Sequence, residues 1–174
     1  AIKTDNFNRT NIENIYAIGD VCGPPWLAHV ASAQGYLAAE HSAGLNVNPI
    51  DYSNIPGCTY CQPQVGSLGM TEEQALSSGF KVKVGRFSFQ ASGKAMAIGN
   101  TIGFVKLIFD EKYGELLGAH IVGSEATEMI AELGMAKALE STWDDLSMTV
   151  HAHPTLSEAI MEAAMDAQGY SIHQ

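Results

Sequence analysis

Two histidines and a glutamate lie close together near the end of the sequence, in the stretch HAHPTLSEA at residues 151–159. A histidine of ordinary pKa, about 6.5, binds and releases a proton around neutral pH. A nearby carboxylate can fix its tautomer and stabilise the imidazolium, as in catalytic triads. Pro154 disfavours a helical conformation for His153, which we therefore expect just ahead of a helix. These residue types and this spacing point to an acid–base pair of His153 and Glu158.

The same stretch has a second interpretation that needs no chemistry. Thr155 fits as the N-cap of a helix, and Glu158 fits as its capping-box partner three residues later. This interpretation explains Thr155 and Glu158 but neither histidine, so both interpretations stay open. The spacing of His151 and His153 also permits a metal pair, but the sequence offers no further cluster of ligands. We expect no metal site.

The three cysteines, Cys22, Cys58 and Cys61, are too few for the disulfide framework of a small secreted domain. Cys58 and Cys61 form a C-x-x-C motif. A structural zinc site needs about four ligands, and the sequence holds no second pair. We expect reduced thiols without a role.

Size and charge exclude several classes of protein. The 174 residues suffice for a sizeable core, and 9 Lys and Arg against 19 Asp and Glu give a net charge of −10. This balance argues against non-specific nucleic-acid binding, and no apolar run is long enough to span a bilayer. No Lys or Arg follows Lys137. The acidic residues beyond it form a solvated face, a surface that meets another chain, or a negative field acting on His151 and His153.

The first part of the chain reads as a strand, a turn and a helix. NIYAIGD, residues 14–20, indicates a buried parallel strand ending in a turn. Residues 26–44 are rich in alanine and end at Gly44, which is typical of a closely packed helix. Residues 45–56 contain two prolines and three asparagines, and we expect a linker there. The expected domains are therefore residues 1–44 and 57–174.

Residues 57–174 show the pattern of an α+β domain. The pattern predicts strands at residues 57–69, 80–89, 103–110 and 115–123. The last two are expected to form a hairpin. Helices are expected from 72 to 78, from Ser124 as N-cap, from about Trp143, and from about 156 to 168. Thr71 and Gln74 form a capping box before the first of these helices. The next helix has apolar positions at Met129, Ile130, Leu133, Ala136 and Leu139, and Gly169 ends the last. The order predicts an antiparallel sheet with helices packed on one side.

Several of these stretches resemble known proteins. HAHPTLSEA resembles the C-terminal signature of the dihydrolipoamide dehydrogenases, which belong to the pyridine nucleotide–disulfide oxidoreductase family. NIYAIGDV is similar to the family's second FAD-contacting strand, and LAHVASAQG to the helix after it. Residues 103–130 resemble the family's dimerisation domain almost throughout. The resemblance covers essentially the whole chain, and it implies a dimerisation domain preceded by a short remnant of the FAD-binding domain.

The resemblance also implies roles in binding FAD. Asp20, following Gly19, would bond the ribityl or ribose side of the cofactor. The backbone of Leu27, Ala28 and His29 would face the pyrimidine end of the flavin, where free N–H groups at a helix start stabilise negative charge.

For the opening stretch, the resemblance implies that His153 is the general acid–base of dithiol–disulfide exchange and that Glu158 orients it. It further implies a cis His153–Pro154 peptide and an obligatory homodimer, in which the pair serves the other subunit. The capping box would compete for the same carboxylate. We expect the carboxylate of Glu158 to bond to the histidine, because a charge-assisted hydrogen bond is roughly twice as strong as a neutral one.

The implied parent enzyme oxidises dihydrolipoamide to lipoamide with NAD⁺, through FAD and a redox-active disulfide, and its partners are the lipoyl domains of 2-oxoacid dehydrogenase complexes. The G-x-G-x-x-G fingerprint and the C-x4-C disulfide are absent from residues 1–174. The chain thus reads as a C-terminal fragment, expected to bind neither FAD nor NAD tightly and to be inactive alone.

Other functions stay open. One is a different reductase of the family, similar to glutathione or mercuric reductase, and another is a non-catalytic dimerisation module. The expected location is the bacterial cytoplasm, or the mitochondrial matrix for a eukaryotic source.

Overall fold

The computed structural model describes residues 1–173, which form two compact units, Ala1–Tyr52 and the residues from Ser53 onward. The division falls inside the proline- and asparagine-rich segment at 45–56. No helix within residues 1–173 is long and apolar enough to cross a membrane.

The first unit is built around one helix, α1 (Ala28–Ser42), preceded by a short 3-10 helix, η1 (Gly19–Cys22). The predicted end of α1 is confirmed: Gly44 has a φ of 77°, and the N–H of Leu45 bonds back to the carbonyl of Glu40 at 3.1 Å. Glycine adopts this left-handed conformation without the penalty of a Cβ.

The strand expected at residues 14–20 is wrong. Tyr16 makes a single isolated bridge with Arg9, and the chain then turns into η1. The N–H of Ala17 bonds to the carbonyl of Asn8, so this short apolar run folds back on the residues just before it. A strand needs a neighbour along its length, and within residues 1–173 the strand pairing of this segment is limited to the bridge between Arg9 and Tyr16.

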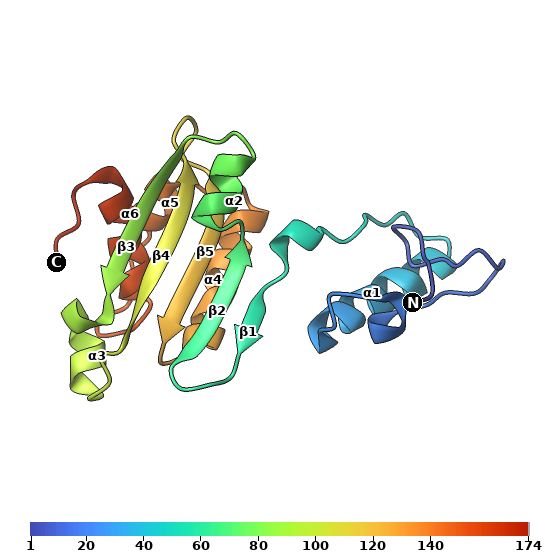
Figure 1. The fold of residues 1–174 in the computed structure, drawn as a ribbon, viewed down its shortest axis with the longest axis horizontal. Coiled ribbons are helices and arrows are strands. Elements are labelled where there is room, and N and C mark those ends of the chain that lie inside the picture. The colour runs from blue at the N-terminus through green and yellow to red at the C-terminus, as the bar shows by residue number, and fades with distance from the viewer. Residues whose placement is uncertain (174) are drawn as a thin grey trace. The chain divides into compact units, whose positions relative to one another are not determined.

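The second unit contains a five-stranded antiparallel sheet in the order β1-β2-β5-β4-β3 (Figure 1). The strands are β1 (Gly57–Thr59), β2 (Gln64–Gly69), β3 (Val82–Ser88), β4 (Gly103–Asp110) and β5 (Leu116–Gly123). The helices are α2 (Glu72–Ser77), α3 (Gly93–Ala97), α4 (Ala126–Ala138), α5 (Trp143–Met148) and α6 (Glu158–Gln168). The 3-10 helices are η2 (Tyr52–Asn54) and η3 (Phe89–Ala91).

Most of the predicted strands are confirmed, including the hairpin of β4 and β5. Residues 57–69 form two strands rather than one, because Thr59 pairs back with Val65. The connection between them contains a cis peptide at Gln62–Pro63.

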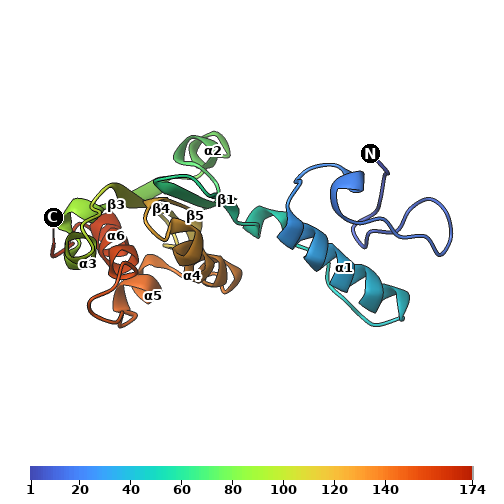
Figure 2. The ribbon, with the colours of Figure 1, turned by 90° about the horizontal axis from the view of Figure 1, so that it is seen from below.

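The main core lies between the sheet and the two longer helices of this unit. α4 packs on β2 and β5, α6 packs on β3 and β4, and α5 packs against α6 (Figure 2). The short helix α2 lies on the opposite face, where Ala75, Ile108 and Leu117 form a small second cluster. The predicted α+β class with the larger helices on one side is confirmed.

Two predicted details at helix ends differ from the structure. The N-cap position of α4 is Glu125, with a φ of 58° and no side-chain cap, whereas the hydroxyl of Ser124 accepts a hydrogen bond from Asn100 at 2.7 Å. Leu139 lies just past α4 and is 69% exposed instead of joining its apolar face. By contrast, the capping box of Thr71 and Gln74 is formed as predicted.

α6 approaches β3 unusually closely. A Cβ placed on Gly85 in β3 would overlap the backbone carbonyl of Ala163 in α6. Small residues line this face of the helix; Ala159, Ala163, Ala164 and Ala167 are all buried. The glycine and the alanines together allow the helix backbone to lie against the strand backbone.

We predict that Gly85→Ala destabilises the second unit by about 3 kcal/mol or more, because neither backbone can move away without disturbing the core. Gly134→Ala in α4 is the matched control, since a Cβ there meets nothing within 4 Å. It should be neutral or stabilising by up to about 1 kcal/mol, because alanine favours helix over glycine. Urea unfolding of both variants measures the difference, and equal midpoints would contradict the close packing.

Candidate active site

His153 and Glu158 form a hydrogen-bonded pair at the start of α6. Nδ1 of His153 lies 2.8 Å from Oε1 of Glu158. An ionised carboxylate only accepts hydrogen bonds, so Nδ1 carries the proton and Nε2 is left with its lone pair. The histidine side chain is 76% exposed, and that of Glu158 is 26% exposed. The His153–Pro154 peptide is cis, as expected.

The expected competition for Glu158 does not occur. Oε1 accepts the bond from His153, while Oε2 accepts the N–H of Thr155 at 2.8 Å. The two oxygens of one carboxylate serve both partners, so the two interpretations of the sequence are compatible. Thr155 is nevertheless not a side-chain cap. Its hydroxyl donates to the carbonyl of Ala152 at 2.7 Å, and Ser157 occupies the N-cap position without a side-chain bond.

The surroundings of Glu158 favour its ionised form. Burial acts to raise the pKa of this carboxyl, but the Thr155 N–H, the hydrogen bond with His153 and the nearby charges of His153 and His151 hold the pKa below its usual value. A carboxylate that accepts two hydrogen bonds is stabilised in this way. Glu158 is therefore in the state needed to hold the proton of His153 on Nδ1.

His151 lies in a different environment from His153. Its side chain is only 5% exposed, and Nε2 lies 2.7 Å from Oε1 of Glu132 in α4. Nδ1 lies 2.9 Å from the carbonyl of Thr149. The hydrogen bond with Glu132 raises the pKa of His151; burial opposes this, and the charges of Glu132 and Glu158 support it. The sequence shows no signal for this pair, because Glu132 precedes His151 by almost twenty residues on another element.

A hollow of about 410 Å³ lies between α4 and the residues after His153. Its lining includes three carboxylates, those of Glu125, Glu128 and Glu132, and one basic residue, Lys94. Pro154 to Ser157 form its other side. The residues between His153 and Glu158 thus border an acidic depression.

The expected cofactor residues lie together in the first unit. Gly19 has a φ of 70°, and its N–H donates to Oε1 of Gln34 at 2.6 Å. Asp20 is exposed within η1. Leu27 is the N-cap position of α1 and gives it no side-chain cap, and Ala28 and His29 begin the helix. The carboxylate of Asp20 is compatible with a hydroxyl group of a cofactor, and the N-terminus of α1 with an anionic part of it.

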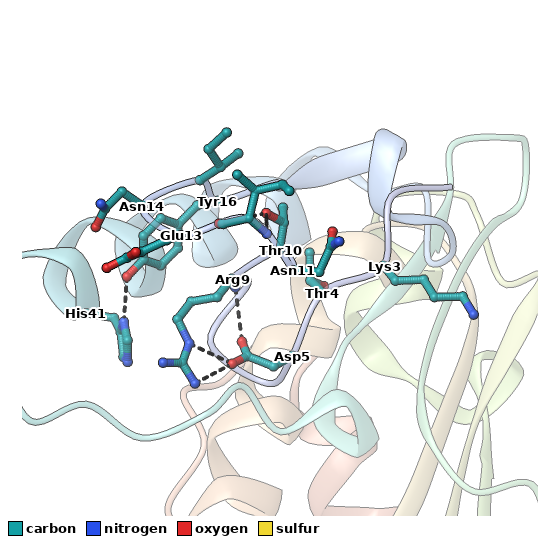
Figure 3. A pocket seen from close by; sticks show the side chains of 12 residues that line it. Lys3, Thr4, Asp5, Arg9, Thr10, Asn11, Glu13, Asn14, Tyr16 and His41 are labelled. Carbon is teal, nitrogen blue, oxygen red and sulfur yellow. Dashed lines mark hydrogen bonds and ion pairs between the residues drawn. The ribbon is translucent and has the colours of Figure 1, made fainter.

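A separate pocket of about 710 Å³ lies in the first unit and is lined by residues 3–5, 9–16 and His41 (Figure 3). The hydroxyl of Tyr16 lies 2.8 Å from Nδ1 of His41, and Arg9 forms an ion pair with Asp5 at 2.7 Å. None of the expected cofactor residues lines this pocket. It has no part in the site derived from the sequence.

The three cysteines are free thiols. Cys58 in β1 packs against the core, and burial, with the charge of Glu128, raises its pKa. Cys61 is exposed, and its thiol donates to the carbonyl of Pro63 at 2.9 Å. Within residues 1–173, no group of three or more His, Cys, Asp or Glu is placed to hold a metal ion.

Comparison with known proteins adds to this geometry. The model of the pyridine nucleotide-disulphide oxidoreductase dimerisation domain matches residues 55–164, and the model of the pyridine nucleotide-disulphide oxidoreductases matches residues 1–35. Both matches agree with the order of the resemblances found in the sequence.

Curated relatives carry the name dihydrolipoyl dehydrogenase. The Rhizobium etli protein is 53% identical over 169 residues, which are 97% of this chain and 35% of that protein. The Zymomonas mobilis protein is 53% identical over 173 residues, 99% of this chain and 37% of that protein. The chain therefore spans a little over a third of the length of these relatives.

Solved structures of flavoprotein relatives share the fold. LpdA from Mycobacterium tuberculosis has a TM-score of 0.89 at 27% identity, covering 95% of this chain and 36% of that one. The HOCl-induced flavoprotein disulfide reductase RclA from Escherichia coli has a TM-score of 0.88 at 27% identity, covering 93% and 38%. With its sheet, its helix order and its sequence all matching, the chain belongs to the pyridine nucleotide-disulphide oxidoreductase family, and residues 55–164 are that family's dimerisation domain.

Proposed function

We propose that this chain is the C-terminal part of a dihydrolipoyl dehydrogenase, which oxidises dihydrolipoamide to lipoamide with NAD⁺. The observation that carries the proposal is the bond of 2.8 Å between His153 and Glu158, with the imidazole otherwise exposed. The name shared by relatives about 50% identical supports this substrate over those of other disulfide reductases.

In this proposal His153 manages protons during dithiol–disulfide exchange. Nε2 takes the proton of a substrate thiol, and Glu158 stabilises the imidazolium that results. The freed thiolate then attacks one sulfur of the enzyme's redox disulfide, so that a new S–S bond forms while the old one breaks. The second substrate thiol displaces the enzyme sulfur, which releases lipoamide and leaves the enzyme as a dithiol.

FAD is the cofactor implied for the parent enzyme, and the residues of the first unit are compatible with it. Asp20 would bond the ribityl or ribose side, and the uncapped start of α1 at Leu27 to His29 would face the pyrimidine end. When bound, FAD carries electrons from the enzyme dithiol to NAD⁺. In the full-length enzyme, residues 1–44 would supply part of the cofactor site, as the remnant of its domain.

The proposed assembly is a homodimer formed by residues 57–174, with residues 45–56 as the linker. Large apolar side chains are exposed on α4, just past its end, on α5 and in the segment that follows α5. They are Met135, Leu139, Met148 and Val150. Large apolar side chains exposed in this way support a protein interface on this part of the second unit.

Lipoyl domains of 2-oxoacid dehydrogenase complexes are the proposed partners of the parent enzyme. The proposed location is the bacterial cytoplasm, a reducing compartment in keeping with three free thiols.

In the full-length enzyme, His153→Gln should lower kcat by roughly 10²–10⁴-fold, the usual cost of a lost acid–base group, with FAD content unchanged. Glu158→Ala should cost less, because the histidine remains. Steady-state oxidation of dihydrolipoamide with NAD⁺ measures both. Turnover close to that of the unaltered enzyme in His153→Gln would refute the assignment.

We predict that the 174-residue chain sediments as a dimer at micromolar concentration, with twice the 18.6 kDa mass of one chain. Obligate interfaces bury more than roughly 2,000 Å². Val150→Asp should weaken the dimer by placing a charge in that interface. Leu76→Asp is the control, since Leu76 is exposed on α2 at the opposite face of the sheet. A monomer for the unaltered chain would contradict the proposal.

We also predict that the purified 174-residue chain is colourless and oxidises no dihydrolipoamide. A Gly-Asp turn and one helix start cannot replace a pyrophosphate-binding G-x-G-x-x-G strand and helix. Visible absorbance after mixing with FAD and desalting tests this. Stoichiometric retention of flavin would show that the proposed division of the cofactor site is wrong.

A further inference from the structure

The proposed mechanism uses His153 and leaves His151 without a role. The two residues are alike in type and only one residue separates them, but their environments are opposite. The side chain of His153 is 76% exposed, whereas that of His151 is 5% exposed. A histidine buried this fully cannot meet a substrate thiol, so any contribution it makes to the reaction passes through other residues.

Both ring nitrogens of His151 face groups that accept hydrogen bonds. Nδ1 lies 2.9 Å from the carbonyl of Thr149, and Nε2 lies 2.7 Å from the carboxylate of Glu132. A neutral imidazole has one donor and one acceptor nitrogen, and its acceptor would then face another acceptor. Both contacts are favourable only when both nitrogens carry protons. The geometry therefore requires an imidazolium, with its charge balanced by Glu132.

The segment that carries His153 is held by short bonds at several points. The N–H and the hydroxyl of Thr149 both donate to the carbonyl of Asp145 in α5. The hydroxyl of Thr155 donates to the carbonyl of Ala152. These bonds are internal to the segment and α5. The bond between His151 and Glu132 joins the same segment to α4.

We propose that His151 is a positioning residue, whose buried imidazolium fastens the segment before His153 to α4 and holds a positive charge beside Glu158. The proposal rests on the proposed function, because His151 acts through the His153–Glu158 pair and does not touch the substrate. Its chemical partner is Glu132, and its effect is on the placement and ionisation of that pair.

The charges around His151 support this role. Glu132 faces it from α4, Glu158 from α6, and His153 follows it in the same segment. The positive charge of His151 is among the interactions that lower the pKa of Glu158 against the effect of burial. An ionised Glu158 is the acceptor that His153 needs. His151 thus contributes both geometry and charge to the pair.

A double-mutant cycle in the full-length holoenzyme tests the proposal. His151→Gln and Glu132→Gln should each lower kcat by roughly 10- to 100-fold, the cost of a small misplacement, with KM for dihydrolipoamide and FAD content unchanged. The matched control is Glu128→Gln, one turn earlier on α4, which should leave kcat within about twofold. In the His153→Gln background, His151→Gln should cause no further loss, since a residue acting only through His153 is not additive with it.

The outcomes separate the two proposals. Near-normal turnover in His153→Gln would refute the proposed function itself. If His153→Gln loses turnover but His151→Gln does not, the positioning role is wrong and the proposed function stands. The role is also wrong if His151→Gln lowers kcat by the same factor with and without His153, because its effect is then a general structural one.

The charge state of His151 has a separate test in the 174-residue chain. Its folded-state pKa is raised above an unfolded value of about 6.5, so the pair stabilises the fold fully below about pH 6.5. This stabilisation is lost as the pH rises through the raised pKa. His151→Gln should therefore lower the free energy of unfolding more at about pH 5.5 than at about pH 9. Equal losses at both pH values would overturn the imidazolium assignment.

Discussion

The packing of α6 against β3 determines where the candidate site begins. The backbone of Ala163 lies against Gly85, at a separation that leaves no room for a Cβ on the strand. One turn further along α6, the carboxylate of Asp166 accepts the N–H of Arg86 at 2.8 Å, so the helix also satisfies a donor on the outer strand of the sheet. These contacts fix the position of a rigid helix. Glu158 is its first residue, and its carboxylate is placed by that packing rather than by the segment before it.

The carboxylate of Glu158 combines two roles that the sequence presents as alternatives. One oxygen accepts the N–H of Thr155, just ahead of α6, and the other accepts a hydrogen bond from His153. The first bond limits the rotation of the side chain, and this directs the second oxygen toward the imidazole. A backbone hydrogen bond just ahead of α6 therefore pre-organises the group that orients His153, and the two bonds use different oxygens.

The acidic end of the chain is more structured than a solvated face. Within residues 1–173 no Lys or Arg follows Lys137, and several carboxylates from α4 and α6 pair instead with histidines. The pairs are His151–Glu132 at 2.7 Å, His153–Glu158 at 2.8 Å and His173–Glu162 at 2.5 Å. The strength of such pairs depends on the protonation of the histidine. The excess of acid in the sequence thus provides hydrogen-bonding partners for the histidines in this part of the molecule.

The sequence by itself determined the structural features that depend only on residues a few positions apart in the chain. Alternation and turn residues identify the hairpin of β4 and β5, Thr71 with Gln74 identifies the start of α2, and Gly169 identifies the end of α6. The spacing of His153 and Glu158 across a helix start was likewise enough to suggest their contact. Each of these features is set by local backbone geometry, which a short stretch of sequence encodes.

Only the tertiary structure decided features that depend on distant partners. Ser124 looked like a cap, but a hydrogen bond from Asn100 takes its hydroxyl. Tyr16 looked like part of a strand, but its pairing is limited to Arg9. The role of His151 follows from its hydrogen bond with Glu132 on another helix, and no local pattern in the sequence predicts that contact. Hydrogen bonds and ion pairs form between groups that the fold brings within a few ångströms of each other. In the second unit, the sheet and the helices packed on it determine which groups come that close.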